Sequence, residues 1–247
     1  VLVFSWIMVF VVGAQSGLGA VQGRTLLFLV LSGLSTGASW LCYFKALQMG
    51  DVNKVTPIDK SSTILTMVLA FIFLGESFGL IQLMALVLIG AGTYLMIQRK
   101  PEEKKEKAGS KWLLYGIGSV VFASLTSILG KVGIEQIDST LGTAIRTIVV
   151  LGMAWVVVFV TKKGSTIRQI DRKSWIFLVL SGMATGGSWL CYYRALQTGP
   201  ASVIVPIDKL SILVTIAFSY LVFREKLTIK SGIGLVLIVA GTLSLLI

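Results

Sequence analysis

The stretch LVLSGLSTGASWLCYFKALQMG (residues 29–50) returns almost unchanged as LVLSGMATGGSWLCYYRALQTG (residues 178–199). The same offset, which takes Leu29 to Leu178, continues without a gap through the motif PIDK and through a later LVLI and AGT in each half. Agreement in register over this length goes well beyond a shared apolar composition and is typical of a tandem duplication. The sequence therefore predicts one structural unit that is built twice.

The repeated segments are strongly apolar. Of the 247 residues, 55% are hydrophobic and only 13% are charged, and the apolar residues form runs of about 20, the length that a helix needs to cross a hydrocarbon core. Such runs predict helices, because barrel strands would alternate polar with apolar residues. We therefore expect an all-α polytopic bundle of about nine transmembrane helices, in segments 1–14, 26–48, 55–74, 79–97, 112–134, 141–161, 175–197, 201–223 and 231–247.

The two copies predict inverted repeats. A full copy contains five hydrophobic segments, an odd number, so the second copy enters the membrane from the opposite side. We expect the first repeat in residues 1–98, a charged linker in 99–111 and the second repeat in 112–247. Aligned with the second copy, the first begins in the middle of a helix, so we expect it to lack helix 1 and half of helix 2 of a ten-helix protein.

The formal charge of +11 is concentrated in the loops at 99–111, 162–173 and 224–230. These loops share one side if the helices alternate, which is the positive-inside pattern of a cytoplasmic face and places the C-terminus outside. No basic stripe with interleaved aromatic residues lies elsewhere, so we expect the lipid bilayer and a small molecule as partners, and no nucleic acid. The chain has no histidine and no nucleophile or phosphate-loop motif, which predicts no enzymatic activity, cofactor or metal.

The repeated motifs resemble a known family. SGxxTGxSWLCYxxALQxG, then PIDK, then a helix ending in FLGE or FREK, then LVLIxAGT, is similar to the EamA family of the drug/metabolite transporter superfamily. The resemblance covers essentially the whole chain. It implies ten helices in two inverted five-helix units around a central cavity and leaves the substrate open. It also implies that both termini are cytoplasmic, which disagrees with the loop charges.

On this basis we predict a secondary transporter, an exporter or exchanger of a small organic metabolite, in the bacterial inner (plasma) membrane. Its mechanism would be alternating access between the inverted halves. One alternative is a lipid or lipid-linked-sugar flippase on the same fold. A second is a non-transporting membrane scaffold, although a scaffold gives no reason to keep charges in register inside both copies.

Those charges belong to the PIDK motifs. Asp59 with Lys60, and Asp208 with Lys209, lie about two turns inside their apolar segments. An ionised group there costs about 2.5 to 3.5 kcal/mol on insertion scales unless it is paired or wetted. The pairs are therefore candidates for a substrate or coupling-ion site, and the two aspartates for proton coupling; the alternative is that they bridge structurally to neighbouring helices.

A proline, Pro57 or Pro206, precedes each pair and predicts a helix kink, because it removes a backbone N–H. A loosened helix beside a charge pair is typical of transporter ligand sites. Adjacent residues point about 100° apart on a helix, so we expect the aspartate and the lysine of each pair to have different partners.

Further candidates lie on other segments. Arg146 is several residues inside its helix and must be paired or face water, whereas Lys131 is near enough to a helix end for its charge to reach the interface. If these basic groups face the cavity, an anionic or zwitterionic substrate is favoured. Trp40 and Trp189 either line the cavity or anchor the helices at the interface. The remaining candidates on the two repeated helices are Tyr43, Ser188 and Tyr192.

Four glycines near the ends of the two copies predict helix packing. Small residues let helix backbones approach closely in membranes. We expect contact between segments 79–97 and 231–247 through Gly90, Gly92, Gly234 and Gly241.

Overall fold

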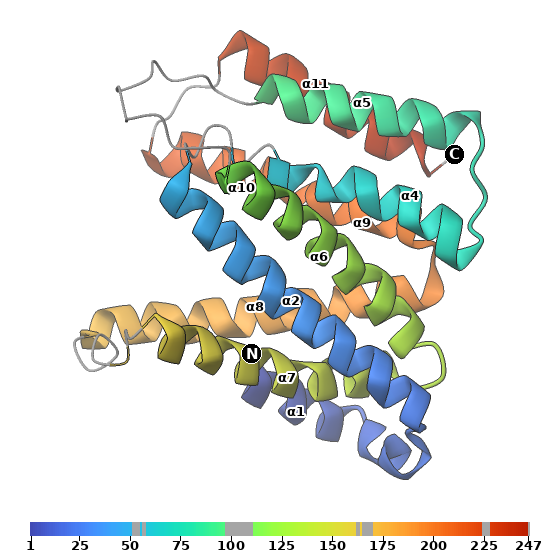
Figure 1. The fold of residues 1–247 in the computed structure, drawn as a ribbon, viewed down its shortest axis with the longest axis vertical. Coiled ribbons are helices and arrows are strands. Elements are labelled where there is room, and N and C mark those ends of the chain that lie inside the picture. The colour runs from blue at the N-terminus through green and yellow to red at the C-terminus, as the bar shows by residue number, and fades with distance from the viewer. Residues whose placement is uncertain are drawn as a thin grey trace. The chain divides into compact units, whose positions relative to one another are not determined.

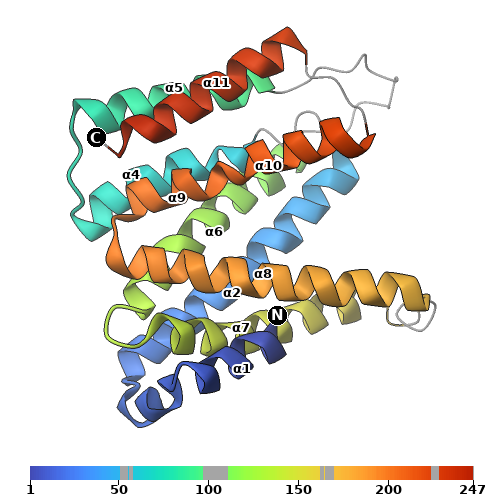
Figure 2. The ribbon, with the colours of Figure 1, turned by 180° about the vertical axis from the view of Figure 1, so that it is seen from behind.

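The computed structural model describes residues 1–50, 55, 58–96, 111–161, 164, 170–223 and 228–246. Helix is the regular secondary structure throughout these ranges, so the predicted all-α class is confirmed. The described elements are α1 (Leu2–Val11), the 3-10 helix η1 (Ala14–Ala20), α2 (Gly23–Met49), α4 (Ser62–Leu74), α5 (Leu80–Met96), α6 (Lys111–Gly133), α7 (Ser139–Val160), α8 (Arg172–Thr198), α9 (Ala201–Lys209), α10 (Ser211–Phe218), the π-helix η3 (Ser219–Phe223) and α11 (Ile229–Ser244) (Figures 1 and 2).

Five helical segments within the described ranges are long and apolar enough to cross a membrane: α2, α6, α7, α8 and the segment Ala201–Val222. A sixth results if α1 and η1, bent by 98°, form one span. The predicted membrane fold is therefore confirmed, but the count of nine spans is not. The opening run turns at Gly13, which has a φ of 73°. Helices α5 and α11 hold only 17 and 16 residues, fewer than the roughly 20 of a full crossing.

The chain divides into two compact units that each combine segments of both sequence repeats. Unit 1 consists of Val1–Ala38 and Leu125–Thr198, and unit 2 of Ser39–Ser124 and Gly199–Ile247. Helices α2 and α6 each contribute one part to unit 1 and the other part to unit 2.

In unit 1, α1 lies beside α7 (Figures 1 and 2), and Val9, Leu141 and Ala144 form a buried apolar cluster between them. Helix α2 also packs closely on α7. A Cβ added at Gly37 would lie 2.5 Å from Cβ of Met153, a separation that no real pair of side chains shows, so glycine is what lets these two helices meet.

The start of α7 is fixed by Asp138. Its carboxylate accepts hydrogen bonds from the backbone N–H groups of Thr140 at 2.8 Å and Leu141 at 3.4 Å, which satisfies two of the donors that every helix leaves unpaired at its N-terminus. The cap sets the register of α7 and places Arg146 about two turns into the helix.

In unit 2, α5 lies beside α11 and α4 beside α9 (Figures 1 and 2). A Cβ added at Gly92 would lie 2.5 Å from the carbonyl oxygen of Gly234, and one added at Gly241 would lie 2.9 Å from Cβ of Leu88. The predicted packing of these two helices through glycine is confirmed at the three positions. Gly90 instead faces the side chain of Ile64 on α4, at 3.2 Å from an added Cβ.

The N-terminus of α9 is held by a carboxylate from the first repeat. Glu76 accepts hydrogen bonds from Ala201 N at 2.6 Å, from Ser202 N at 2.9 Å and from Ser202 Oγ at 2.6 Å. A negative charge at a helix N-terminus is favourable because the free N–H groups and the helix dipole are positive there. This contact ties the loop after α4 to the helix that carries the second PIDK motif.

Candidate functional site

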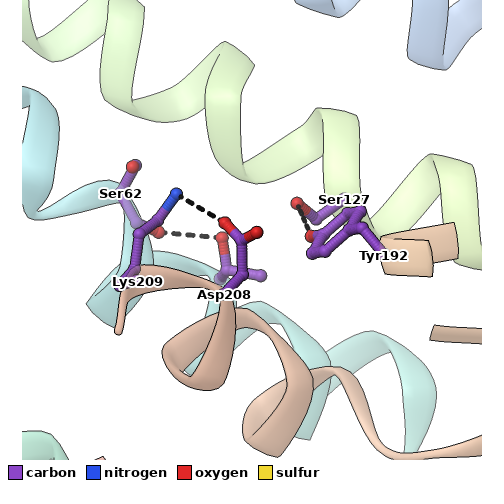
Figure 3. A network of polar contacts seen from close by, with 6 residues as sticks. Ser62, Ser127, Tyr192, Asp208 and Lys209 are labelled. Atoms are coloured by element: carbon purple, nitrogen blue, oxygen red, sulfur yellow. Dashed lines mark hydrogen bonds and ion pairs between the residues drawn. The ribbon is translucent and has the colours of Figure 1, made fainter. Parts of the chain in front are cut away.

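Four ionisable side chains from the two repeats share one region of unit 2, and we call them the PIDK quartet: Asp59, Lys60, Asp208 and Lys209. Lys60 lies close enough to the other three for the charge of each to act on it. Asp208 pairs with Lys209 at 3.4 Å (Figure 3). Oδ1 of Asp59 accepts a hydrogen bond of 2.9 Å from Ser119 on α6. Two positive and two negative charges therefore balance within the quartet.

The pairing of Asp208 with Lys209 corrects the expectation that adjacent residues of the motif have different partners. Helix α9 ends at Lys209, and Leu210 separates it from α10. Both residues lie in the last turn of α9, and the long lysine side chain reaches back to the neighbouring carboxylate. In the first copy Asp59 has a partner outside the motif, the hydroxyl of Ser119.

Both PIDK segments end at the same kind of helix break. Residues 58–60 are helical, Ser61 is a turn, and α4 begins at Ser62. The N–H of Ser61 donates to the carbonyl of Ile58 at 3.0 Å, and the N–H of Leu210 donates to the carbonyl of Ile207 at 2.9 Å. These are tighter, 3-10-type bonds at positions that correspond in the two repeats. Such interruptions are typical of hinges and of discontinuous helices at transporter sites.

Of the two predicted helix-kink prolines, Pro206 lies within the described residues. Pro206 is buried inside α9, and the break in the helix falls at Leu210, one turn further on, rather than at the proline itself. Pro57 lies outside the described residues.

Protein covers the quartet only in part, although it removes some of the hydration of Lys60. The side chains of Lys209 and Asp208 are 40% and 36% exposed, and Lys60 is exposed as well. The described residues therefore leave part of the surface of Lys60, Asp208 and Lys209 uncovered.

A second polar cluster lies in unit 1 around Arg146 of α7, whose side chain is 2% exposed. Its Nε donates to Ser32 Oγ at 3.0 Å, and its Nη2 donates to Thr36 Oγ1. Both hydroxyls belong to α2. The Ser32 hydroxyl in turn donates to the carbonyl of Thr126 at 2.7 Å, and the Thr36 hydroxyl donates to the carbonyl of Ser32 at 3.0 Å. Each hydroxyl therefore presents a lone pair to the guanidinium.

Two aromatic rings of α8 complete the cluster. The guanidinium carbon of Arg146 lies 5.0 Å from the ring centroid of Trp189 and 4.9 Å from that of Tyr193, within the range of cation–π attraction. Gly130 of α6 makes room for one of them, since an added Cβ would lie 2.7 Å from Cε1 of Tyr193. We call Arg146, Ser32, Thr36, Trp189 and Tyr193 the Arg146 cluster.

One end of this guanidinium has no partner. Nη1 of Arg146 is buried without a hydrogen bond, and no carboxylate in the described part of the chain pairs with the side chain. We expected Arg146 to be paired or to face water. In the structure its partners are hydroxyls and aromatic rings, and neither neutralises its charge.

The other predicted site residues lie on α2, α6 and α8. Tyr192 and Ser127 of unit 1 share a hydrogen bond of 2.9 Å (Figure 3), and Lys131 is half-buried in the last turn of α6. Ser188 is exposed on α8. In unit 2, Trp40 is 38% exposed and Tyr43 is half-buried.

Several residues of the two clusters were not predicted as site residues. For Ser32 and Thr36, the i, i+4 spacing of two hydroxyls on a membrane helix is a usable signal. Tyr193 follows a predicted aromatic residue directly. Ser119 and Gly130 carry no such signal, because their roles arise only when α6 packs on other helices.

The fold and these sites define a class: a polytopic helical membrane protein with a duplicated core, broken helices and charges in its interior. The family model "EamA-like transporter family" matches residues 1–98 and 110–247, so the chain belongs to that family, as the motifs predicted. It is an integral membrane protein, and the membership supports a membrane transporter rather than an enzyme.

Two curated relatives and one solved structure are similar to this chain. The chain is 42% identical over 134 residues, 54% of its length and 95% of the relative, to "Uncharacterized transporter in cobO 3'region" of Sinorhizobium sp.. It is 38% identical over 76 residues to an uncharacterized protein of Methanocaldococcus jannaschii, covering 30% of this chain and 55% of that one. A solved crystal structure matches with a TM-score of 0.68, covering 98% of this chain and 97% of its own. Its sequence identity of 14% limits that likeness to the fold.

Proposed function

We propose that this protein is a secondary transporter that moves a small anionic or zwitterionic organic metabolite across the bacterial inner membrane, as an exporter or exchanger. Two inverted repeats, in residues 1–98 and 112–247 with the linker 99–111 between them, exchange conformations and open the substrate site to each side in turn. The observation that carries the proposal is the PIDK quartet beside two equivalent helix breaks.

The energetics of the quartet favour transport over a structural role. Ionised groups inside a membrane segment are costly and are found where they pair or line a water-filled path. A purely structural network would bury and fully pair its members, whereas Lys60, Asp208 and Lys209 keep much of their surface exposed. A reachable, charge-balanced group is suited to exchanging one partner for another during a cycle.

Proton coupling is assigned to Asp59 and Asp208. A carboxylate in the interior of a transporter can bind a proton on one side and release it on the other. The two copies differ in their partners: Asp208 is held by a cation, and Asp59 by the hydroxyl of Ser119. Alternating access requires that, in any one conformation of the protein, the two inverted repeats differ from each other locally. The different partners of Asp59 and Asp208 are such a difference.

The test is flux into proteoliposomes that contain the purified chain. Radiolabelled organic acids, amino acids and amines are offered in turn, each with and without an imposed proton gradient. We expect gradient-dependent uptake or counterflow of an acid or amino acid, and at least a tenfold loss of gradient dependence in Asp59→Asn and Asp208→Asn. Asp171→Asn, a substitution of an exposed loop carboxylate, is the matched control.

Two results would overturn the proposal. Uptake of amines alone would contradict the substrate class. Movement of a fluorescent phospholipid between leaflets, with no solute flux, would instead identify a flippase.

A further inference from the structure

We propose that the Arg146 cluster binds the carboxylate of the transported metabolite, through the end of the guanidinium that no protein group occupies. The inference rests on the proposed transport function and adds to it a substrate-binding residue and a chemical class: a monocarboxylate or a zwitterion with one carboxylate. It is carried by the hydrogen-bond geometry, the burial and the missing counter-charge of Arg146.

Arg146 leaves some of its hydrogen-bond donors unused. A guanidinium offers five N–H groups in a planar fork. The pair on its side, Nε and Nη2, is used by Ser32 and Thr36. Both hydroxyls donate their own hydrogen atoms to backbone carbonyls and so can only accept from the guanidinium. The protein thereby fixes this side of the fork. The N–H groups of Nη1 and the second N–H of Nη2 remain at the end of the fork, and Nη1 has no partner.

The positive charge of Arg146 is not compensated by the described residues. Removing one ion from water costs several kcal/mol in proteins, and hydroxyls and aromatic rings recover only part of that cost. The described residues provide no carboxylate for Arg146, although the PIDK quartet shows that this chain does place carboxylates beside lysines of its apolar segments. An anionic ligand supplies the missing charge, and the end of the fork matches the two oxygens of a carboxylate.

The charge and the ring surfaces of the Arg146 cluster indicate the class of ligand. The cluster has one positive charge, so one carboxylate makes it neutral, whereas a dicarboxylate or a phosphate dianion would leave a charge without a partner. Trp189 and Tyr193 flank the guanidinium with apolar ring surface, which suits a ligand with an apolar body. A cation without a carboxylate is repelled.

The burial of Arg146 gives the site a place in the cycle. With 2% of the side chain exposed, a ligand reaches Nη1 only when the helices around it part. The site is therefore closed in the described conformation, and opening it is coupled to the exchange of conformations that alternating access provides.

The experiment measures binding and flux on the full chain. Purified protein in nanodiscs is offered matched pairs of probes, aliphatic and aromatic monocarboxylates and amino acids against their carboxamides, and binding is followed by tryptophan fluorescence and by the thermal unfolding midpoint. We expect binding of carboxylates and at least a tenfold weaker effect of the carboxamides. Arg146→Lys, which keeps the charge but loses the fork, should weaken binding about tenfold, and Arg146→Gln should abolish it.

The controls separate recognition from folding. Arg194→Gln removes an exposed arginine of α8 that bonds to Gln197 and should leave binding unchanged. Ser32→Ala frees one side of the fork, keeps the charge and should change affinity by a few-fold. If Arg146 variants do not fold, the probe pairs on the unsubstituted protein still decide: equal binding of carboxylates and carboxamides overturns the proposal, as does preferred binding of phosphates.

The two proposals fail in different ways. Solute flux that Arg146→Lys and Arg146→Gln leave unchanged would overturn the carboxylate site and leave the transporter standing. Carboxylate binding that depends on Arg146, without flux of any solute, would overturn the transporter and leave the site.

Discussion

The PIDK quartet and the Arg146 cluster answer the same physical problem in opposite ways. Both place charge inside apolar helices, where an unpaired ion is costly. The quartet balances two lysines with two aspartates and leaves them partly exposed. The Arg146 cluster surrounds one cation with hydroxyls and rings, buries it and provides no counter-charge among the described residues.

The difference indicates a division of labour. A balanced and accessible group can change its proton or ion occupancy without a large change in stability. A buried and unbalanced cation gains most from an anion that comes from outside. We therefore expect the quartet to serve proton coupling and the Arg146 cluster to serve substrate binding. Each function can be tested by changing the charge balance of its own cluster alone.

Among substitutions that keep Arg146, the largest effect is expected when the Arg146 cluster is given its own carboxylate. Thr36→Asp places an anion where Nη2 of Arg146 now meets a hydroxyl. The new carboxylate neutralises the guanidinium, so the carboxylate of the ligand is no longer needed as its counter-charge. We expect carboxylate binding to fall by about a hundredfold, roughly the 2 to 3 kcal/mol of one charge-assisted bond, while the unfolding midpoint rises. Isothermal titration with the best monocarboxylate probe measures the first quantity, and thermal unfolding the second.

Thr36→Asn is the matched control, because it has nearly the same shape as Asp and no charge. It should retain binding within a few-fold. Equal losses in Asp and Asn variants would mean that the shape of the cluster, and not its charge, is what the ligand senses.

A substitution remote from both regions separates packing from charge. At Gly92 an added Cβ would lie 2.5 Å from Gly234 O and 2.9 Å from the backbone N of Ile238, so Gly92→Val overpacks the contact of α5 with α11. We expect destabilisation of about 1 to 3 kcal/mol, measured by denaturant unfolding in mild detergent, with unchanged affinity for the carboxylate probe in the folded fraction.

Gly232→Ala serves as its control, since no atom lies within 4 Å of the added Cβ. Its unfolding free energy should not fall, and it can rise by up to about 1 kcal/mol because alanine is the better helix former. A loss of affinity in Gly92→Val would show that α5 and α11 act on the site beyond packing.

In the PIDK quartet the expected effect on stability is smaller. Asp208→Asn leaves two lysines with one aspartate, and we expect a loss of about 1 kcal/mol, because the pair is partly exposed and screened. Asp208→Asn combined with Lys209→Gln restores the balance and should recover the unfolding midpoint, but not gradient-dependent flux. Recovery of both by the double variant would remove Asp208 from the coupling mechanism.

Much of the architecture was predictable because it depends on local pattern. Runs of apolar residues predicted helices, and the repeated motifs predicted the family. The glycine contact of α5 with α11 followed from small residues in register. The need of Arg146 for a partner also followed from its depth in an apolar segment.

What the sequence could not provide depends on tertiary packing. The partners of Arg146 come from α2 and α8, and the room for Tyr193 comes from Gly130 of α6; no spacing rule joins such distant segments. The break after the second PIDK motif fell at Leu210, one turn beyond Pro206, and Asp208 paired with the adjacent Lys209. The short α5 and α11 likewise kept the predicted count of spans from being confirmed.

The smallest effect is expected at a carboxylate outside the membrane segments. Asp171 accepts hydrogen bonds from the N–H groups of Lys173 at 3.1 Å and Ser174 at 3.2 Å at the start of α8. The side chain and backbone of Ser174 hold the pKa of Asp171 below its usual 3.8. A lowered pKa in the folded state means that the ionised form stabilises the fold above pH 3.8, and that this contribution disappears as the pH falls through the folded value.

Asp171→Asn keeps an acceptor for the cap and removes only the charge. Because the carboxylate is fully exposed, its unfolding midpoint at pH 7 should drop by less than that of any variant above. In unfolding measured from pH 7 to pH 3, the gap between the two proteins should narrow as Asp171 becomes protonated. A gap that does not narrow towards pH 3 would mean that the charge of Asp171 does not stabilise the fold, and that the difference between the two proteins comes from the altered helix cap.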